Sequence, residues 1–236
     1  LVLKNARIVN VFTGEIIRGD IAIQDGIIAG IGSFHGKEER DLAGRYVCPG
    51  FIDSHLHLES TLVTPAELVT VASRHGTTTF IVDPHESANV SGLAGIDYIL
   101  DQTEDVKANV YVMMPSCVPA TAIDDNGCTL TAEDMAPYLH NSRILGLGEV
   151  MDSISVVQGE KSMHDKLELF EGRIRDGHAP FLEEGDLQAY AMAGIATDHE
   201  CSFFDYAMRE RRNGLTILVR EGLSLIHISE PTRHLR

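Results

Sequence analysis

Residues 50–59 read Gly50-Phe51-Ile52-Asp53-Ser54-His55-Leu56-His57-Leu58-Glu59 and carry the strongest signal in this 236-residue sequence. Their apolar beginning, directly after a Pro-Gly turn, predicts a strand over residues 50–55. Residues i and i+2 of a strand face the same way, with Cβ atoms about 7 Å apart, so the rings of His55 and His57 can converge on one metal ion. On a helix the same spacing would turn the rings to nearly opposite sides. Two polar residues at the end of a strand are the alternative interpretation, and the strand pattern before them favours the metal site.

The sequence before this stretch has a different pattern. Residues 1–48 alternate short apolar runs with turn signals, which predicts a small β unit. Asp25-Gly26 lies between two apolar runs and is a strong hairpin signal. Pro49-Gly50 ends this unit, and the pattern changes at once.

The sequence after residue 50 alternates short apolar runs with helical segments. The predicted strands cover residues 50–55, 77–82, 109–114, 144–148, 174–178, 194–197 and 215–219. The predicted helices cover residues 65–75, 91–104, 131–140, 162–172, 186–193 and 203–213. This alternation is typical of an α/β fold with a parallel sheet, either doubly wound or closed into a barrel.

The ends of the predicted strands distinguish these two folds. No glycine-rich phosphate-binding turn of the G-x-G-x-x-G or G-x-x-x-x-G-K-[ST] type follows any strand, as a doubly wound nucleotide-binding protein would require. Histidines and carboxylates follow the strands instead, which is typical of a (β/α)8 barrel. We therefore predict a TIM-like (β/α)8 barrel that is cut after about seven strands.

Both ends of the sequence are unusual. The chain begins at Leu1, already inside an apolar strand pattern. Residues 223–236 resemble a translated sequencing adapter, and we expect them to be a non-native tail. The expected organisation is a β unit at 1–48, an incomplete barrel at 49–222 and the tail at 223–236.

Four further strand ends carry residues that bind metals or move protons. Asp83-Pro84-His85-Glu86 follows the second strand, and Glu149, His178 and His199-Glu200 follow the fourth, fifth and sixth. Any one of these histidines alone would more often be an ordinary loop residue. Barrel strands, however, send their C-terminal ends to one mouth, so we expect a shared site. A carboxylate among imidazoles suits a two-metal centre, because its two oxygens can bridge both ions. The predicted metal ligands are His55, His57, Glu149, His178 and His199.

The composition excludes several classes of function. The formal charge of −16 argues against nonspecific binding to nucleic acid or to anionic membranes. No apolar run approaches the length of a membrane span, and the N-terminus lacks the layout of a signal peptide, so we expect a cytoplasmic protein. The four cysteines are widely spaced and form no C-x-x-C pair, which predicts neither a disulfide framework nor a zinc knuckle.

These motifs resemble those of the amidohydrolase superfamily and, within it, the bacterial-type adenine deaminases. The resemblance covers residues 1–222 and is most specific at residues 49–60, 77–86, 116–120, 146–152, 176–178 and 199–200. Glu149 stands where other amidohydrolases usually have a carbamylated lysine. The resemblance implies a barrel flanked by a β-sandwich built from both chain ends. It also implies a binuclear Mn²⁺ or Fe²⁺ centre bridged by Glu149, with the four predicted histidine ligands divided between the two ions.

The resemblance also implies a reaction, the hydrolysis of adenine to hypoxanthine and ammonia by a homo-oligomer. The predicted catalytic residues are Glu149, His85 and Glu200, and the predicted substrate-binding residues are Glu59, His85, Glu86 and Ser116. Several of these could instead orient a metal ligand, a role for which Asp53 and Asp198 are the first candidates. The superfamily's eighth-strand aspartate has no counterpart in the sequence, so we expect this chain alone to be inactive.

Two other functions stay open at this point. One is hydrolysis of a cyclic amide by another member of the same superfamily. The presence of Glu149 in place of a lysine argues against this function. The other is a noncatalytic metal-binding barrel. The cytidine-deaminase fold is rejected, because it needs an H-x-E motif together with a P-C-x-x-C motif around one zinc ion, and the sequence has no P-C-x-x-C.

Overall fold

The computed structural model describes residues 1–121 and 123–219, and the predicted tail at 223–236 lies outside them. The chain divides into two compact units, Leu1–Phe51 and the residues from Ile52 onward. Among the described residues, no helix combines the length and the apolar character needed to cross a membrane.

The first unit is a β-sheet. β1, β2 and β3 form an antiparallel meander, and the short strands β4 and β5 pair in parallel with β1. The predicted hairpin is present: Asp25 and Gly26 both have positive φ, 51° and 78°, as a two-residue turn with φ > 0 at both positions requires. Ala6, Ile8 and Ile21 form the core of this unit. The strands are β1 (Val2–Asn10), β2 (Glu15–Gln24), β3 (Ile27–Gly32), β4 (Glu39–Asp41) and β5 (Tyr46–Val47).

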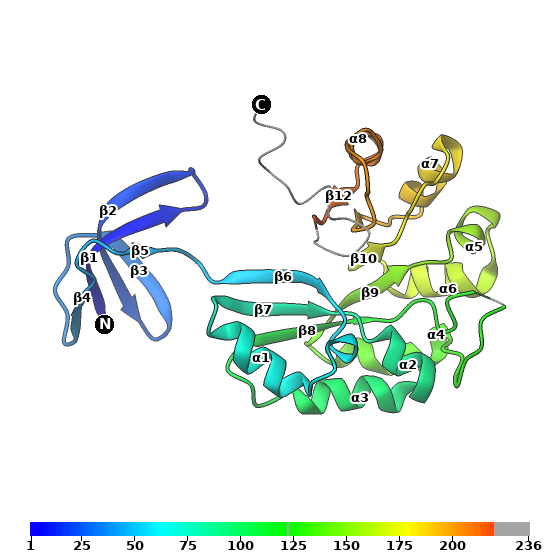
Figure 1. Ribbon diagram of the computed structural model, residues 1–236, viewed down its shortest axis with the longest axis horizontal. Coiled ribbons are helices and arrows are strands. Elements are labelled where there is room, and N and C mark those ends of the chain that lie inside the picture. The colour runs from blue at the N-terminus through cyan, green and yellow to red at the C-terminus, as the bar shows by residue number, and fades with distance from the viewer. Residues whose placement is uncertain (122, 220–236) are drawn as a thin grey trace. The chain divides into compact units, whose positions relative to one another are not determined.

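The second unit is built on a curved sheet whose strands lie in sequence order, β10-β9-β8-β7-β6 (Figure 1). The strands β7, β8, β9 and β10 pair in parallel, each with the next, and β11 and β12 form a further parallel pair. The N–H of Ala196 donates to the carbonyl of Arg175, which brings the start of β11 beside β10. The strands are β6 (Phe51–Leu56), β7 (Thr77–Val82), β8 (Asn109–Met114), β9 (Ile144–Val150), β10 (Ile174–Gly177), β11 (Thr197–Asp198) and β12 (Thr216–Ile217).

Helices follow these strands, as a βα barrel requires. α1 and α3 lie along one face of β6, β7 and β8 (Figure 1). The helices are α1 (Pro65–Ser73), α2 (His85–Ser91), α3 (Leu93–Gln102), α4 (Ala132–Met135), α5 (Ser153–Gln158), α6 (Lys161–Leu169), α7 (Glu184–Met192) and α8 (Phe204–Arg212), with 3₁₀ turns η1 (Glu59–Thr61) and η2 (Ala136–His140).

The order of strands agrees with the prediction, and two helices differ from it. α2 and α5, with seven and six residues, are not among the predicted helices. Neither is long enough to show a repeating apolar face, so periodicity could not reveal them. The strands at β8 and β9 are almost continuously buried, which is typical of parallel strands covered on both faces. The observed fold is thus a curved parallel sheet with its strand ends directed to one side.

Candidate metal centre

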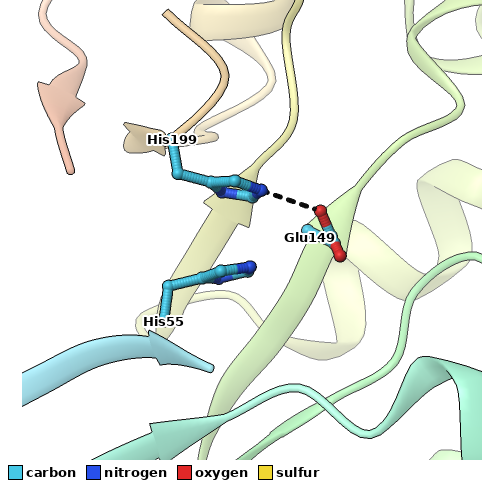
Figure 2. Close-up of side chains that lie close together, drawn as sticks. All are labelled: His55, Glu149 and His199. Atoms are coloured by element: carbon cyan, nitrogen blue, oxygen red, sulfur yellow. Dashed lines mark ion pairs between the residues drawn. The ribbon is translucent and has the colours of Figure 1, made fainter. Parts of the chain in front are cut away.

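The structure brings the five predicted metal ligands together at the C-terminal ends of the strands. His55 lies near the end of β6 with His57 just beyond it, and Glu149 lies in β9. His178 and His199 are the first residues after β10 and β11. Figure 2 shows His55 and His199 side by side, with the His199 ring directed at the Glu149 carboxylate. The two rings stack with centroids 3.7 Å apart.

The carboxylate of Glu149 is the centre of this group, and only 3% of its side chain is exposed. Its Oε1 lies 3.4 Å from Nε2 of His57 and 3.1 Å from Nδ1 of His85. Its Oε2 lies 2.8 Å from Nδ1 of His178 and 3.1 Å from Nε2 of His199. Each oxygen therefore faces two imidazoles, an arrangement that can hold one ion on each side of the carboxylate.

The H-x-H pair has a spacing that suits one shared ion. Nε2 of His55 and Nε2 of His57 are 3.2 Å apart. Two nitrogen ligands at about 2.1 Å from an ion, with an angle between about 90° and 109° at the ion, would be about 3.0–3.4 Å apart. The observed separation lies within that interval.

The other ring nitrogens of this pair are held by the protein. Nδ1 of His55 lies 2.8 Å from Oδ2 of Asp176, and Nδ1 of His57 lies 2.8 Å from the carbonyl oxygen of Asp83. Such contacts fix the tautomer of a metal-binding histidine, because the bonded nitrogen carries the proton and leaves the other free. Both Nε2 atoms are thus left to face the site.

The orienting role that we predicted for Asp53 and Asp198 falls to another aspartate. Oδ1 of Asp53 accepts from the backbone N–H of His55, and the Asp198 carboxylate accepts from the backbone N–H groups of Ala179 and Glu200. These two aspartates therefore accept hydrogen bonds from the backbone, and it is Asp176 that contacts the imidazole ring of His55. Asp176 lies two residues before the predicted ligand His178, but Asp53 has the same spacing to His55, so spacing could not have told them apart.

The electrostatics of the site follow from burial and from these contacts. Burial alone would raise the pKa of Glu149, but the nearby imidazoles of His178, His199 and His85 outweigh it and hold that pKa well below its usual range. Burial opposes the protonated form of His85, but Asp83 and Glu149 raise the pKa of its imidazole to about 10. The buried carboxylates therefore strongly favour positive charge beside them.

Atoms without partners test whether metal ions fit here. Within the described part of the chain, Nδ1 of His85, both ring nitrogens of His199 and Oδ1 of Asp83 are buried without a hydrogen-bond partner. Such buried polar atoms are costly unless something binds them. Three sets of donor atoms, each lying within 4.8 Å of one another, are His55-Glu149-His199, His57-His85-Glu149 and His178-His199-Glu200. Imidazole and carboxylate donors in this arrangement fit divalent ions.

The remaining predicted site residues lie around this group at different depths. Oε1 of Glu200 lies 3.6 Å from Nε2 of His199 and 3.9 Å from Nδ1 of His178, so Glu200 joins the cluster. Ser116 is buried, and its hydroxyl donates to the carbonyl of Glu149 rather than pointing among the imidazoles. Its substrate-binding role stays a prediction.

The two other predicted substrate residues are Glu59, the first residue of η1, and Glu86, in the first turn of α2. Oε1 of Glu59 accepts from the N–H groups of Glu86 and Ser87, so it caps this helix. Oε2 of Glu86 accepts from the hydroxyl of Ser60, and its side chain is exposed. Their roles toward a substrate also stay predictions. A cavity of about 490 Å³, lined by residues that include His55, His57 and His199, opens beside the centre.

Comparison with known proteins places the chain in a family. Residues 46–233 match the model of the amidohydrolase family. The chain belongs to the amidohydrolase family. Similar curated amidohydrolases include adenine deaminases from Desulfitobacterium hafniense (strain Y51), 57% identical over 236 residues, and from Clostridium acetobutylicum, 49% identical over 224 residues. These matches cover 100% and 94% of this chain and 42% and 39% of the relatives, so the chain spans about two fifths of their length.

Solved structures of amidohydrolase type share the fold. Molinate hydrolase matches with a TM-score of 0.60 at 11% identity, covering 93% of this chain and 63% of that structure. A dihydroorotase matches with a TM-score of 0.57 at 17% identity, covering 92% and 64%. These likenesses support the barrel architecture of this amidohydrolase and do not bear on its substrate.

Proposed function

We propose that the protein containing this chain is an adenine deaminase, which hydrolyses adenine to hypoxanthine and ammonia. The observation that carries the proposal is the Glu149 carboxylate, whose two oxygens each face two imidazoles. The substrate is inferred from the curated relatives, which are named adenine deaminases at 57% and 49% identity.

The proposed centre holds two divalent ions on His55, His57, Glu149, His178 and His199. We propose Mn²⁺ or Fe²⁺, because the donors that surround Glu149 within the described residues are imidazoles and a carboxylate. When bound, such ions supply the Lewis-acid chemistry that makes water a nucleophile near neutral pH.

The protein groups around the centre have separate tasks. The backbone of Glu149 is fixed on both sides of its Cα, because its N–H donates to Oδ2 of Asp83 and its carbonyl accepts from the hydroxyl of Ser116. Glu200, beside His178 and His199, can take a proton from water and deliver it to the departing amine. The water oxygen bonds to C6 of the purine, the C6–N bond breaks, and the amine leaves as ammonia with the proton that Glu200 delivers. The second proton of the water ends on a ring nitrogen of hypoxanthine.

The proposal also covers the protein's partners and location. We propose a homo-oligomer that acts on a free purine base and has no nucleic-acid or membrane partner, and the formal charge of −16 supports this last point. The four cysteines, which are all free thiols in the structure, support a reducing compartment such as the cytoplasm.

An activity assay on the full-length protein tests the proposal. The protein is loaded with Mn²⁺, and ammonia release is measured with adenine, adenosine and dihydroorotate as alternative substrates. We expect adenine to be preferred, and Glu149→Gln to abolish activity while Glu171→Gln, at an exposed position, preserves it. Faster turnover of adenosine or of the cyclic amide would overturn the assigned substrate.

A further inference from the structure

His85 occupies a position that its predicted roles in catalysis and substrate binding do not explain. It is the first residue of α2, and its ring lies between two carboxylates. Nδ1 of His85 is 3.1 Å from Oε1 of Glu149 and 3.7 Å from Oδ1 of Asp83. This nitrogen is buried and has no hydrogen-bond partner among the described residues.

We propose that His85 is itself a ligand of the metal centre, completing a donor set with His57 and Oε1 of Glu149. The inference rests on the proposed metal centre and adds a sixth protein ligand to it. The donor atoms of these three residues lie within 4.8 Å of one another. The rings of His57 and His85 meet edge to face, with centroids 4.6 Å apart.

The two oxygens of Glu149 then have equivalent surroundings. His57 and His85 face Oε1 as His178 and His199 face Oε2. Without His85, the Oε1 side would have one imidazole in contact with the carboxylate, and a buried imidazole nitrogen would lie beside it unused. A buried nitrogen 3.1 Å from a bridging carboxylate oxygen is placed as a ligand of the same ion would be.

The backbone around His85 is fixed in a way that suits a ligand. The N–H of Asp83 donates to the carbonyl of Leu56, which ties this segment to the strand that carries the H-x-H pair. Glu59, two residues after His57, accepts from the first amides of α2. Pro84, directly before His85, is buried and has a restricted φ. His85 is therefore held in a set position relative to His57.

Metal binding tests this inference more directly than activity does. The full-length protein, wild type and His85→Ala, is stripped of metal and dialysed against a series of free Mn²⁺ concentrations, and bound Mn²⁺ is counted. We expect two ions in the wild type, and in the variant one ion with unchanged affinity and a second bound at least about tenfold more weakly. The matched control is His75→Ala, because His75 is exposed and lies after α1, and this variant should bind as the wild type does.

A rescue experiment separates lost coordination from lost folding. His85→Gly with added imidazole should recover part of the weakened Mn²⁺ affinity, because free imidazole can occupy the space and bind the ion, whereas a misfolded variant would not respond. Unchanged affinity for both ions in His85→Ala, with a changed KM or kcat, would overturn the inference. His85 would then have a role in substrate binding or catalysis instead. If Glu149→Gln also left both affinities unchanged, the proposed centre itself would fail.

Discussion

Oδ2 of Asp176 lies 2.8 Å from Nδ1 of His55, although the two residues are 121 positions apart in the sequence. Both side chains are largely buried, with exposed fractions of 6% and 7%. Oδ1 of the same aspartate accepts from the hydroxyl of Thr197 and from the N–H of Gly177, so the carboxylate is itself held firmly. This contact joins β6 to β10 and sets which nitrogen of His55 faces the metal centre.

Asp176→Asn should therefore weaken metal binding without removing a ligand. The amide can present its NH₂ group to Nδ1 and favour the wrong tautomer, and we expect the affinity for Mn²⁺ to fall about 10–100-fold. Equilibrium dialysis of the full-length protein measures this. Asp53→Asn is the control, because the one hydrogen bond of Asp53 within the described residues is to the backbone N–H of His55, and its replacement should change the affinity far less.

Gly148 is a position where any side chain would disturb the centre. A Cβ atom there would lie 2.4 Å from Oδ2 of Asp83, the oxygen that accepts from the N–H of Glu149. We expect Gly148→Ala to destabilise the protein by about 1–3 kcal/mol and to lower its metal content, because Asp83 must move. Thermal unfolding and elemental analysis measure the two effects.

Gly185 in α7 provides the matched control for this substitution. A Cβ atom at Gly185 would have no neighbour within 4 Å. Gly185→Ala should leave the metal content unchanged and stabilise the helix by up to about 1 kcal/mol. Equal behaviour of the two alanine variants would show that the contact between Gly148 and Asp83 has no consequence for the site.

Glu200→Gln tests the proposed path of the proton. The amide keeps the size of the side chain but cannot take up a proton, so kcat for adenine should fall about 10²–10⁴-fold. Metal content is measured on the same sample, because Glu200 also lies near His178 and His199. A kcat within a few fold of the wild type, at full metal content, would remove Glu200 from the mechanism.

The first unit offers a test by pH. The Asp20 carboxylate accepts from the ammonium of Lys4 and from the N–H groups of Asn5 and Phe34, and these contacts lower its pKa to about 2. Because the pKa in the folded chain lies below the value of about 3.9 expected when unfolded, the stabilisation is complete above pH 4 and is lost as the pH falls toward 2.

Asp20→Asn should therefore loosen the first unit near pH 6 and make less difference as the pH falls. Hydrogen exchange of peptides from residues 1–34, compared between variant and wild type at each pH, measures this. Asp25→Asn is the control, because Asn is as favourable as Asp in this turn. A difference between Asp20→Asn and wild type that stayed constant from pH 6 to pH 2.5 would contradict the assigned role of the charge.

Much of the fold could be predicted because strand periodicity and strand ends are local features. The alternation around His55 and His57 predicts a strand, and the rule that barrel strands end at one mouth then brings Glu149, His178 and His199 to the same place. The structure has these residues together. β11 covers Thr197–Asp198 and shares only Thr197 with the strand predicted at 194–197, and β12 covers two of the five residues predicted at 215–219.

The contacts that orient the site could not be predicted in the same way. The approach of His85 to Glu149 depends on α2, a seven-residue helix without an apolar repeat. The role of Glu59 depends on the same helix, since its carboxylate caps it. Several aspartates lie near the predicted ligands in the sequence. Spacing alone gave no reason to predict that Asp176, rather than Asp53 or Asp198, would contact a histidine ring.

Anomalous diffraction from crystals of the Mn²⁺-loaded full-length protein tests the central claim most directly. We predict two manganese peaks that share Glu149, one in contact with Oε1 and with His57 and the other in contact with Oε2 and with His199. A single peak, or two peaks of which either makes no contact with Glu149, would contradict the bridged two-metal centre.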